Sequence, residues 1–177
     1  MRVISGVYRS RKLESLTGDN TRPTIDRVKE AIFASLYNLK NKYFLDLFAG
    51  SGSIGIEALS RGASFVLFNE NNHNALKIIK KNLNNLKITE GFKLNSLNYL
   101  ECLSSVDIKF DFIYLDPPFN SDYYQKALDL IEKYQLLNEL GIIIIESDLL
   151  LELTSSYYQV FKVATYGKIK IQYLRRG

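Results

Sequence analysis

The 177-residue chain has very few sulfur and imidazole side chains. It contains one cysteine, Cys102, and one histidine, His73. A disulfide needs two cysteines, and a structural zinc site needs about four Cys or His ligands, so the chain can build neither within itself. We therefore predict no metal site and expect no chemical role for Cys102 or His73. The low cysteine content favours a reduced, cytoplasmic setting.

Long hydrophobic runs are also absent. No stretch approaches the roughly 18 apolar residues of a membrane span, and the N-terminal sequence MRVISGVYRSRK lacks the apolar middle of a signal peptide. Hydrophobic residues still make up 46% of the chain, enough for one compact domain with a full core. We expect a soluble monomer that does not contact a membrane.

Positive charge is concentrated near the N-terminus. Residues 1–42 contain nine Lys/Arg and four Asp/Glu, whereas the remainder contains 14 basic and 15 acidic residues. A basic arm favours a polyanionic partner, because Lys and Arg neutralise phosphates and release counterions. A solvated tail without a partner fits the charge equally well. We divide the chain into a basic N-terminal extension, residues 1–42, and a body, residues 43–177.

The body alternates short apolar runs with amphipathic segments, which predicts βα units and a mostly parallel sheet. We expect strands at residues 43–48, 65–69, 92–95, 110–115 and 141–146, and helices at 53–60, 72–86, 96–103 and 123–137. A closing antiparallel pair is expected at residues 157–163 and 168–174. In the extension we expect a strand or hairpin and then a helix capped by Thr24, with a buried stripe of Ile25, Val28, Ile32, Phe33 and Leu36.

A glycine-rich turn follows the first strand of the body. The sequence YFLDLFAGSGSIGI places Gly50, Gly52 and Gly55 in the G-x-G-x-x-G spacing. Such a turn suits any ligand that approaches the backbone closely, and tight packing of helix on strand is the structural alternative. Glu70 ends the next strand, 20 residues after Gly50, where an acid holds both hydroxyls of an adenosine ribose. NAD and S-adenosylmethionine remain equally possible at this point.

An acid beside the turn favours a cationic ligand. Asp46 lies four residues before Gly50. A dinucleotide enzyme uses the helix N-terminus after the glycines to neutralise a pyrophosphate. A carboxylate at that place opposes a pyrophosphate and suits the sulfonium and ammonium groups of S-adenosylmethionine.

The sequence FDFIYLDPPF indicates a nucleobase pocket after the strand at residues 110–115. Asp116 and the carbonyl of Pro117 can each accept one hydrogen of a planar amino group, and Phe119 can stack on the base for about 1–3 kcal/mol. Pro117 and Pro118 fix the backbone of this loop. Holding both hydrogens favours a pyramidal nitrogen whose lone pair points at the methyl group of a sulfonium. We therefore expect a methyltransferase acting on an exocyclic amine, with Asp116, Pro117, Pro118 and Phe119 as its catalytic residues.

These motifs together resemble the RsmD-type methyltransferases of bacteria. The resemblance covers nearly the whole chain and is carried by RVISGVYRSRKL, TRPTIDRVKEAIF, LDLFAGSGSIGIEALSRGA, FNENNHNALKIIKKNL and FDFIYLDPPF. It implies a Rossmann-like class I fold with a seven-stranded, mostly parallel sheet, helices on both faces and an antiparallel hairpin at the end. It also implies methylation of the exocyclic N2 of one guanine in small-subunit (16S) ribosomal RNA, presented on the assembled or assembling subunit.

The resemblance assigns a role to each motif residue. The cofactor-binding set would be Asp46, Phe48, Gly50, Gly52 and Gly55 near the methionine part, Glu70 at the ribose and Asn95 at the adenine. The guanine would lie against Asp116 to Phe119.

Three departures from the family pattern concern these roles. The family's Gly-Gly-x-Trp-Arg is Ser5 to Arg9 here, Val-Glu-x-Asp is Asn69 to Asn72, and an adenine-contacting acid is Asn95. A weaker affinity for the cofactor follows as a hypothesis.

The basic extension supplies the expected RNA contacts. Arg9, Arg11, Arg22 and Arg27 are candidates for holding RNA phosphates, and Asp26 for orienting an arginine, although plain surface roles remain open. The target base would have to be unpaired or flipped out. Three alternatives remain: methylation of adenine N6 or cytosine N4 in RNA or DNA, a dehydrogenase, and a non-catalytic module for ribosome assembly.

Overall fold

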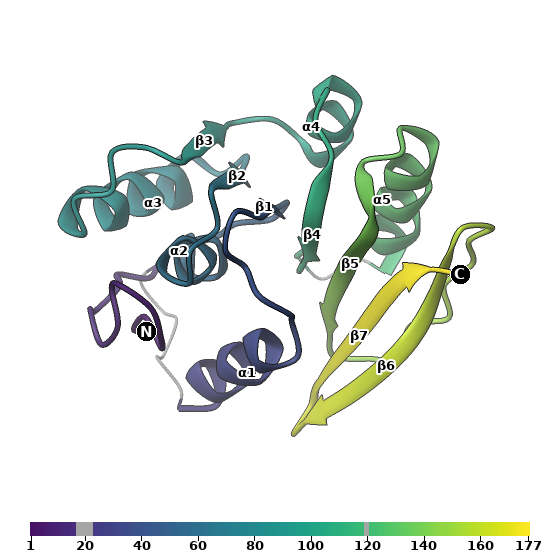
Figure 1. Cartoon of the computed structure of the whole chain (residues 1–177), viewed down its shortest axis with the longest axis horizontal. Coiled ribbons are helices and arrows are strands. Elements are labelled where there is room, and N and C mark those ends of the chain that lie inside the picture. The colour runs from purple at the N-terminus through teal and green to yellow at the C-terminus, as the bar shows by residue number, and fades with distance from the viewer. Residues whose placement is uncertain (17–22, 119–120) are drawn as a thin grey trace.

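Seven strands form one mixed sheet in the order β3-β2-β1-β4-β5-β7-β6 (Figure 1). The computed structural model describes residues 1–16, 23–118 and 121–177, so Arg22, Phe119 and the side chains of Thr24 and Ile25 lie outside the described residues. The strands are β1 (Tyr43–Asp46), β2 (Phe65–Asn69), β3 (Phe92–Asn95), β4 (Phe110–Leu115), β5 (Leu137–Ser147), β6 (Tyr158–Tyr166) and β7 (Ile169–Arg176). The helices are α1 (Pro23–Ala34), α2 (Ser53–Ser60), α3 (His73–Asn85), α4 (Tyr99–Ser105) and α5 (Ser121–Lys133).

The pairing of the strands confirms the expected mostly parallel sheet with a closing hairpin. Strands β1 to β5 pair in parallel, and β7 runs antiparallel to both β5 and β6. The order reverses at β1, which lies between β2 and β4. In open α/β sheets, ligands bind beyond the carboxyl ends of the strands at such a reversal. Figure 1 shows the N-terminal segment beside α2 and the β6–β7 hairpin at the opposite end of the sheet.

Successive side chains of each strand point to opposite faces of the sheet, so both faces carry apolar side chains, and helices cover both. Val28, Ile32 and Phe33 of α1 pack with α2, α3 and one face of the sheet. Helices α4 and α5 pack on the other face, where Cys102 is buried. None of the helices in the described ranges is long and apolar enough to cross a membrane.

The N-terminal extension is packed into the hydrophobic core that α1, α2 and α3 form with one face of the sheet. Val3 and Leu13 are buried there, beside α1 to α3. The Lys29 ammonium is buried, donates to the Arg2 carbonyl (2.6 Å) and the Ser53 hydroxyl (2.9 Å), and lies 3.8 Å from the Glu57 carboxylate. In place of a regular hairpin, the described part of the extension before α1 forms one antiparallel bridge, Arg2 to Lys12.

Several predicted boundaries were wrong, and two of them have local reasons. The helix expected at residues 96–103 begins at Tyr99, because the Asn98 side chain accepts a hydrogen bond from the Glu101 N–H (3.0 Å) and caps it. The helix expected to reach residue 137 ends at Lys133, where Gln135 adopts a left-handed φ of 51°. Strand β5 then begins at Leu137, four residues earlier than expected.

Candidate active site

A cavity of about 1240 Å³ lies at the carboxyl ends of the central strands. Its lining includes Gly50 after β1, Glu70 after β2, Asp116 after β4 and Glu146 at the end of β5. The sheet therefore brings predicted cofactor and substrate residues, far apart in sequence, into one pocket.

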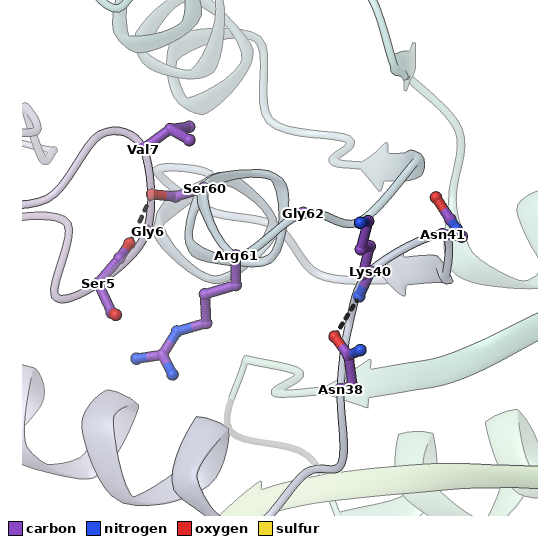
Figure 2. Close-up of a pocket in the computed structure, with 9 residues that line it drawn as sticks. All are labelled: Ser5, Gly6, Val7, Asn38, Lys40, Asn41, Ser60, Arg61 and Gly62. Atoms are coloured by element: carbon purple, nitrogen blue, oxygen red, sulfur yellow. Dashed lines mark hydrogen bonds between the residues drawn. The ribbon is translucent and has the colours of Figure 1, made fainter.

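A second, smaller cavity of about 690 Å³ lies at the opposite edge, around the end of α2. Figure 2 shows that Lys40 and Arg61 point away from each other there. Arg61 is bonded to the Glu57 carboxylate (2.8 Å). This second cavity contains none of the predicted site residues.

The three glycines of the turn have different surroundings. Gly50 (φ 55°) and Gly52 (φ 77°) are left-handed, which favours glycine. A Cβ on Gly50 would meet nothing within 4 Å, whereas a Cβ on Gly55 would lie 2.2 Å from Cε1 of Phe68. Gly50 lines the cavity, and Gly52 and Gly55 are outside its lining, packed against α3 and β2. Cofactor contact by Gly52 and Gly55 stays a prediction, with close packing as their observed environment.

Asp46 is buried beneath the glycine turn. Its Oδ2 accepts the Gly55 N–H at 3.0 Å, which satisfies one of the unpaired donors at the start of α2. Gly52, the N-cap residue, has no side chain to do so. Burial raises the pKa of Asp46 to about 7; the Gly55 N–H opposes this shift and the nearby Glu70 charge adds to it. Asp46 supports the turn from behind the cavity lining.

Glu70 is fixed by two backbone donors. One carboxylate oxygen accepts the Gly50 N–H (2.7 Å) and the other accepts the Asn72 N–H (2.8 Å). The Asn72 side chain caps α3 by accepting from the Asn74 and Ala75 N–H groups. Each carboxylate oxygen has a second lone pair, so Glu70 is held in place yet can still accept a hydroxyl from a ligand.

Phe48 and Asn95 have contrasting positions. Phe48 lines the cavity in an aromatic cluster with Tyr99 and Tyr123, with ring centroids 5.4 and 6.4 Å away. The Asn95 amide nitrogen lies 4.0 Å from Sγ of Cys102, and Asn95 is outside the cavity lining. Burial raises the pKa of the Cys102 thiol to about 11. The role of Asn95 at the adenine stays a prediction.

Asp116, Pro117 and Pro118 all line the cavity where β4 ends. Asp116 and Pro118 are exposed to the pocket and Pro117 is buried. Crowding by protein atoms, followed by the charges of Glu146 and Asp46, raises the pKa of the Asp116 carboxyl well above its usual range. Water in the pocket moderates this effect, because the side chain is open to solvent on one side. Among the described residues, no group donates a hydrogen bond to Asp116.

Sequence reasoning missed a second acid at this end of the pocket. Glu146 lies at the carboxyl end of β5, next to β4, and accepts a short hydrogen bond from the Tyr114 hydroxyl. The Tyr124 hydroxyl donates to its backbone carbonyl at 2.8 Å. The available signal was an acid that ends the expected strand at 141–146. Lys126 and Lys168, also missed, lie in the lining.

The structure separates the predicted RNA contacts. The backbone of Val7 bonds to the last residue of α2, and the Arg11 guanidinium lies 3.4 Å from the last carbonyl of α3. These helices start at the pocket edge and run for about 12 and 20 Å. Arg11 and the adjoining Arg9 therefore lie at the far edge of the molecule, beside the ends of α2 and α3 that point away from the cavity.

Two other predicted RNA residues lie on α1. Asp26 pairs with Arg2 (3.6 Å), and Arg27 is exposed. Both are close in sequence to Lys29, which contacts the first residue of α2. Neither Asp26 nor Arg27 is part of the cavity lining, and their contact with RNA stays a prediction.

The pocket fits S-adenosylmethionine in its chemistry. Gly50 leaves open space for a ligand, Glu70 can accept hydroxyls, and the surrounding acids suit positive charge. Among the described residues, no three His, Cys, Asp or Glu side chains are grouped so as to hold a metal ion.

Comparisons with known proteins agree with this fold. The family model described as Conserved hypothetical protein 95 matches residues 1–175. The YlbH protein of Bacillus subtilis is 38% identical over 100% of both chains. Ribosomal RNA small subunit methyltransferase D of Haemophilus influenzae is 38% identical over 84% of this chain and 79% of its own.

Solved structures extend the likeness to the fold. A crystal structure described as a methylase from Haemophilus influenzae has a TM-score of 0.82 at 31% identity, covering 99% of this chain and 98% of that one. A S-adenosylmethionine-dependent methyltransferase from Streptococcus mutans, at 14% identity, shares the fold with a TM-score of 0.67 over 84% of this chain and 47% of its own. The chain belongs to the RsmD family of methyltransferases and has the class I fold of enzymes that use S-adenosylmethionine.

Proposed function

We propose that this protein transfers a methyl group from S-adenosylmethionine to the exocyclic N2 of one guanine in small-subunit (16S) ribosomal RNA, during assembly of the subunit. The observation that carries the proposal is the position of Asp116, Pro117 and Pro118 in the same cavity as Gly50 and Glu70. The name of the relative from Haemophilus influenzae supports ribosomal RNA as the substrate.

The β1–β2 half of the pocket would hold the cofactor. Glu70, fixed by two backbone N–H groups, would accept the ribose hydroxyls, and Gly50 would let the methionine part approach the backbone. Phe48 would pack against the cofactor from the aromatic cluster. Asn95 is the candidate at the adenine. When bound, S-adenosylmethionine supplies an electrophilic methyl group on a sulfonium.

The β4 end would hold the target amine. The Asp116 carboxylate would accept one N2 hydrogen and the Pro117 carbonyl the other, with Phe119, outside the described residues, as the candidate stacking partner. This arrangement turns the nitrogen lone pair toward the methyl group. The N2–carbon bond forms as the sulfur–carbon bond breaks, and the surplus N2 proton leaves to solvent or to Asp116. The products are N2-methylguanosine and S-adenosylhomocysteine.

The RNA would approach the pocket edge over positive charge. Lys126 and Lys168 at the rim can contact the phosphates beside a flipped nucleotide. Arg27 extends this basic surface along α1, whereas Arg9 and Arg11 would contact RNA that reaches the far edge. In this interpretation residues 1–42 serve as the RNA-contacting extension of a catalytic domain formed by residues 43–177.

The test is mass spectrometry of ribosomal RNA from cells that lack the gene, complemented with the wild type or with Asp116→Ala. We expect one N2-methylguanosine to disappear from small-subunit RNA, and to return with the wild type alone. Retention of every methylated guanine would refute the proposal. Loss of an N6-methyladenosine or N4-methylcytidine would favour another exocyclic amine, and rescue by Asp116→Ala would favour a non-catalytic assembly factor.

A further inference from the structure

We propose that Glu146 selects guanine as the target base, by accepting the N1–H of guanine while Asp116 and the Pro117 carbonyl hold its N2 amino group. This inference rests on the proposed function. It adds a substrate-contacting residue that the Asp-Pro-Pro sequence does not contain.

The strand register places the two acids side by side. Strands β4 and β5 pair in parallel, with Tyr114 opposite Ile144 and Leu115 opposite Ile145. Asp116 directly follows the end of β4 and Glu146 is the next residue of β5, so both come immediately after the Leu115–Ile145 pair on strands about 4.8 Å apart. Because side chains alternate along a strand, Glu146 shares a face of the sheet with Ile144, and Tyr114 of β4 packs in the same core cluster as Ile144. Both acids line the cavity.

Two tyrosines hold Glu146 in place. The Tyr114 hydroxyl donates to Oε2 of its carboxylate, and the Tyr124 hydroxyl donates to its backbone carbonyl at 2.8 Å. A carboxylate has about four acceptor positions on its two oxygens, so one hydroxyl bond leaves capacity for a ligand. Glu146 is therefore a positioned hydrogen-bond acceptor.

Asp116 and Glu146 have no cationic partner among the described residues. The ion pairs within that part of the chain include neither acid. Burial raises the pKa of Glu146 above its usual range, and the Tyr114 hydroxyl opposes that shift. Two crowded acids without a cation suit a ligand that brings several hydrogen-bond donors.

Guanine presents such a set of donors. Its N1–H and its N2 amino group lie side by side on one edge, whereas adenine has an acceptor, N1, beside its N6 amino group, and cytosine has an acceptor, N3, beside N4. A carboxylate facing either acceptor would bring lone pairs together. Asp116 and Pro117 alone could hold any of the three amines. Glu146 disfavours binding of adenine and cytosine, and this makes the site specific for guanine.

The experiment uses small subunits reconstituted with either guanosine or 2-aminopurine riboside at the methylated position. 2-Aminopurine keeps the N2 amine but has an acceptor at N1. We expect the wild type to favour guanine by about 100-fold in kcat/KM, the size typical of one positioned polar contact. Glu146→Gln should bring this ratio near one, because its amide can donate to the N1 acceptor. Tyr114→Phe should shift the ratio the same way by a smaller factor.

Glu152→Gln is the matched control, since it removes the same charge at an exposed acid outside the cavity lining. It should leave the ratio unchanged, and thermal melting with calorimetric titration of S-adenosylmethionine should show that Glu146→Gln folds and binds the cofactor. An equal loss on both substrates, or an unchanged ratio, would overturn the role of Glu146. A wild type that transfers no methyl to guanine would instead overturn the proposed function.

Discussion

The acids in the two halves of the pocket are held differently. At the β1–β2 side, Asp46 and Glu70 accept backbone N–H groups of the glycine turn and the start of α3. At the β4–β5 side, the described residues give Asp116 no donor, and give the Glu146 carboxylate the Tyr114 hydroxyl. The first pair of acids is part of the backbone framework, and the second pair is available to a ligand.

Asp46 and Glu70 therefore support the backbone around the pocket, whereas Asp116 and Glu146 keep acceptor positions open for a ligand. Carboxylates bonded to backbone N–H groups keep their geometry whether or not a ligand is bound. Acids without such donors are crowded, and their pKa values rise until a ligand supplies hydrogen-bond donors. Substitutions on the β1–β2 side should therefore change mainly stability and cofactor binding, and substitutions on the β4–β5 side should change mainly methyl transfer.

Removing Asp116, the proposed acceptor of the target amine, should have the largest effect. Asp116→Ala should lower kcat by about 10³-fold, because one N2 hydrogen loses its acceptor. Binding of S-adenosylmethionine and of the small subunit should persist. Steady-state assays with labelled methyl donor, together with calorimetric titration, provide the measurement. A kcat within tenfold of the wild type would show that Asp116 does not hold the amine.

The pH dependence of stability should report Asp46. Its pKa of about 7 in the folded protein lies above the ordinary value of 3.8. The folded state therefore binds more protons between these values, and the free energy of unfolding should fall as the pH rises from about 4 to 7. The contribution is at most about 4 kcal/mol.

Asp46→Asn tests this directly, because its amide oxygen can still accept the Gly55 N–H. Urea unfolding between pH 4 and 8 should show a smaller decline than in the wild type, with Asp116 and Glu146 still contributing in the same direction. The same slope in both proteins would mean that Asp46 titrates normally.

Two glycine substitutions should separate packing from ligand binding. Gly55→Ala should destabilise the fold by about 1–3 kcal/mol, because its Cβ would clash with the Phe68 ring. Gly50→Ala has open space and should cost about 1–2 kcal/mol through its left-handed backbone. It should also weaken cofactor binding, which Gly55→Ala should alter much less. Chemical unfolding and titration of S-adenosylmethionine measure the two effects, and the reverse pattern would contradict our assignment.

The smallest effects are expected from single arginines of the extension. Arg27→Ala should weaken binding to the small subunit about five-fold and lower the salt dependence by about one ion. Arg9→Ala, at the far edge, should have a smaller effect. Binding assays at several salt concentrations compare the two. A larger loss for Arg9 would mean that the RNA contacts mainly the far edge.

Much of the fold was predictable because it depends on local patterns. The expected segments 53–60, 92–95 and 110–115 match α2, β3 and β4, since their apolar runs are bounded by turn residues. Errors arose where a single residue decides a boundary, as with the cap Asn98 and the left-handed Gln135. Local composition does not reveal which of several polar residues adopts such a conformation.

The candidate site was predictable only in part. The glycine turn and Asp116 carry recognisable spacing within one segment. Glu146 does not, because it meets Asp116 only through the parallel pairing of β4 and β5, about 30 residues apart in sequence. The charge of the extension did not reveal where its arginines lie. Packing along α2 and α3 places Arg9 and Arg11 away from the cavity, and the RNA contacts of the extension stay predictions.

The most direct test combines the purified protein, small subunits from cells lacking the gene, and S-adenosylmethionine with a labelled methyl group. The RNA is then digested to nucleosides and analysed by mass spectrometry. We predict one labelled N2-methylguanosine per subunit, absent with Asp116→Ala. Label in N6-methyladenosine or N4-methylcytidine, or no transfer by the wild type, would contradict the account.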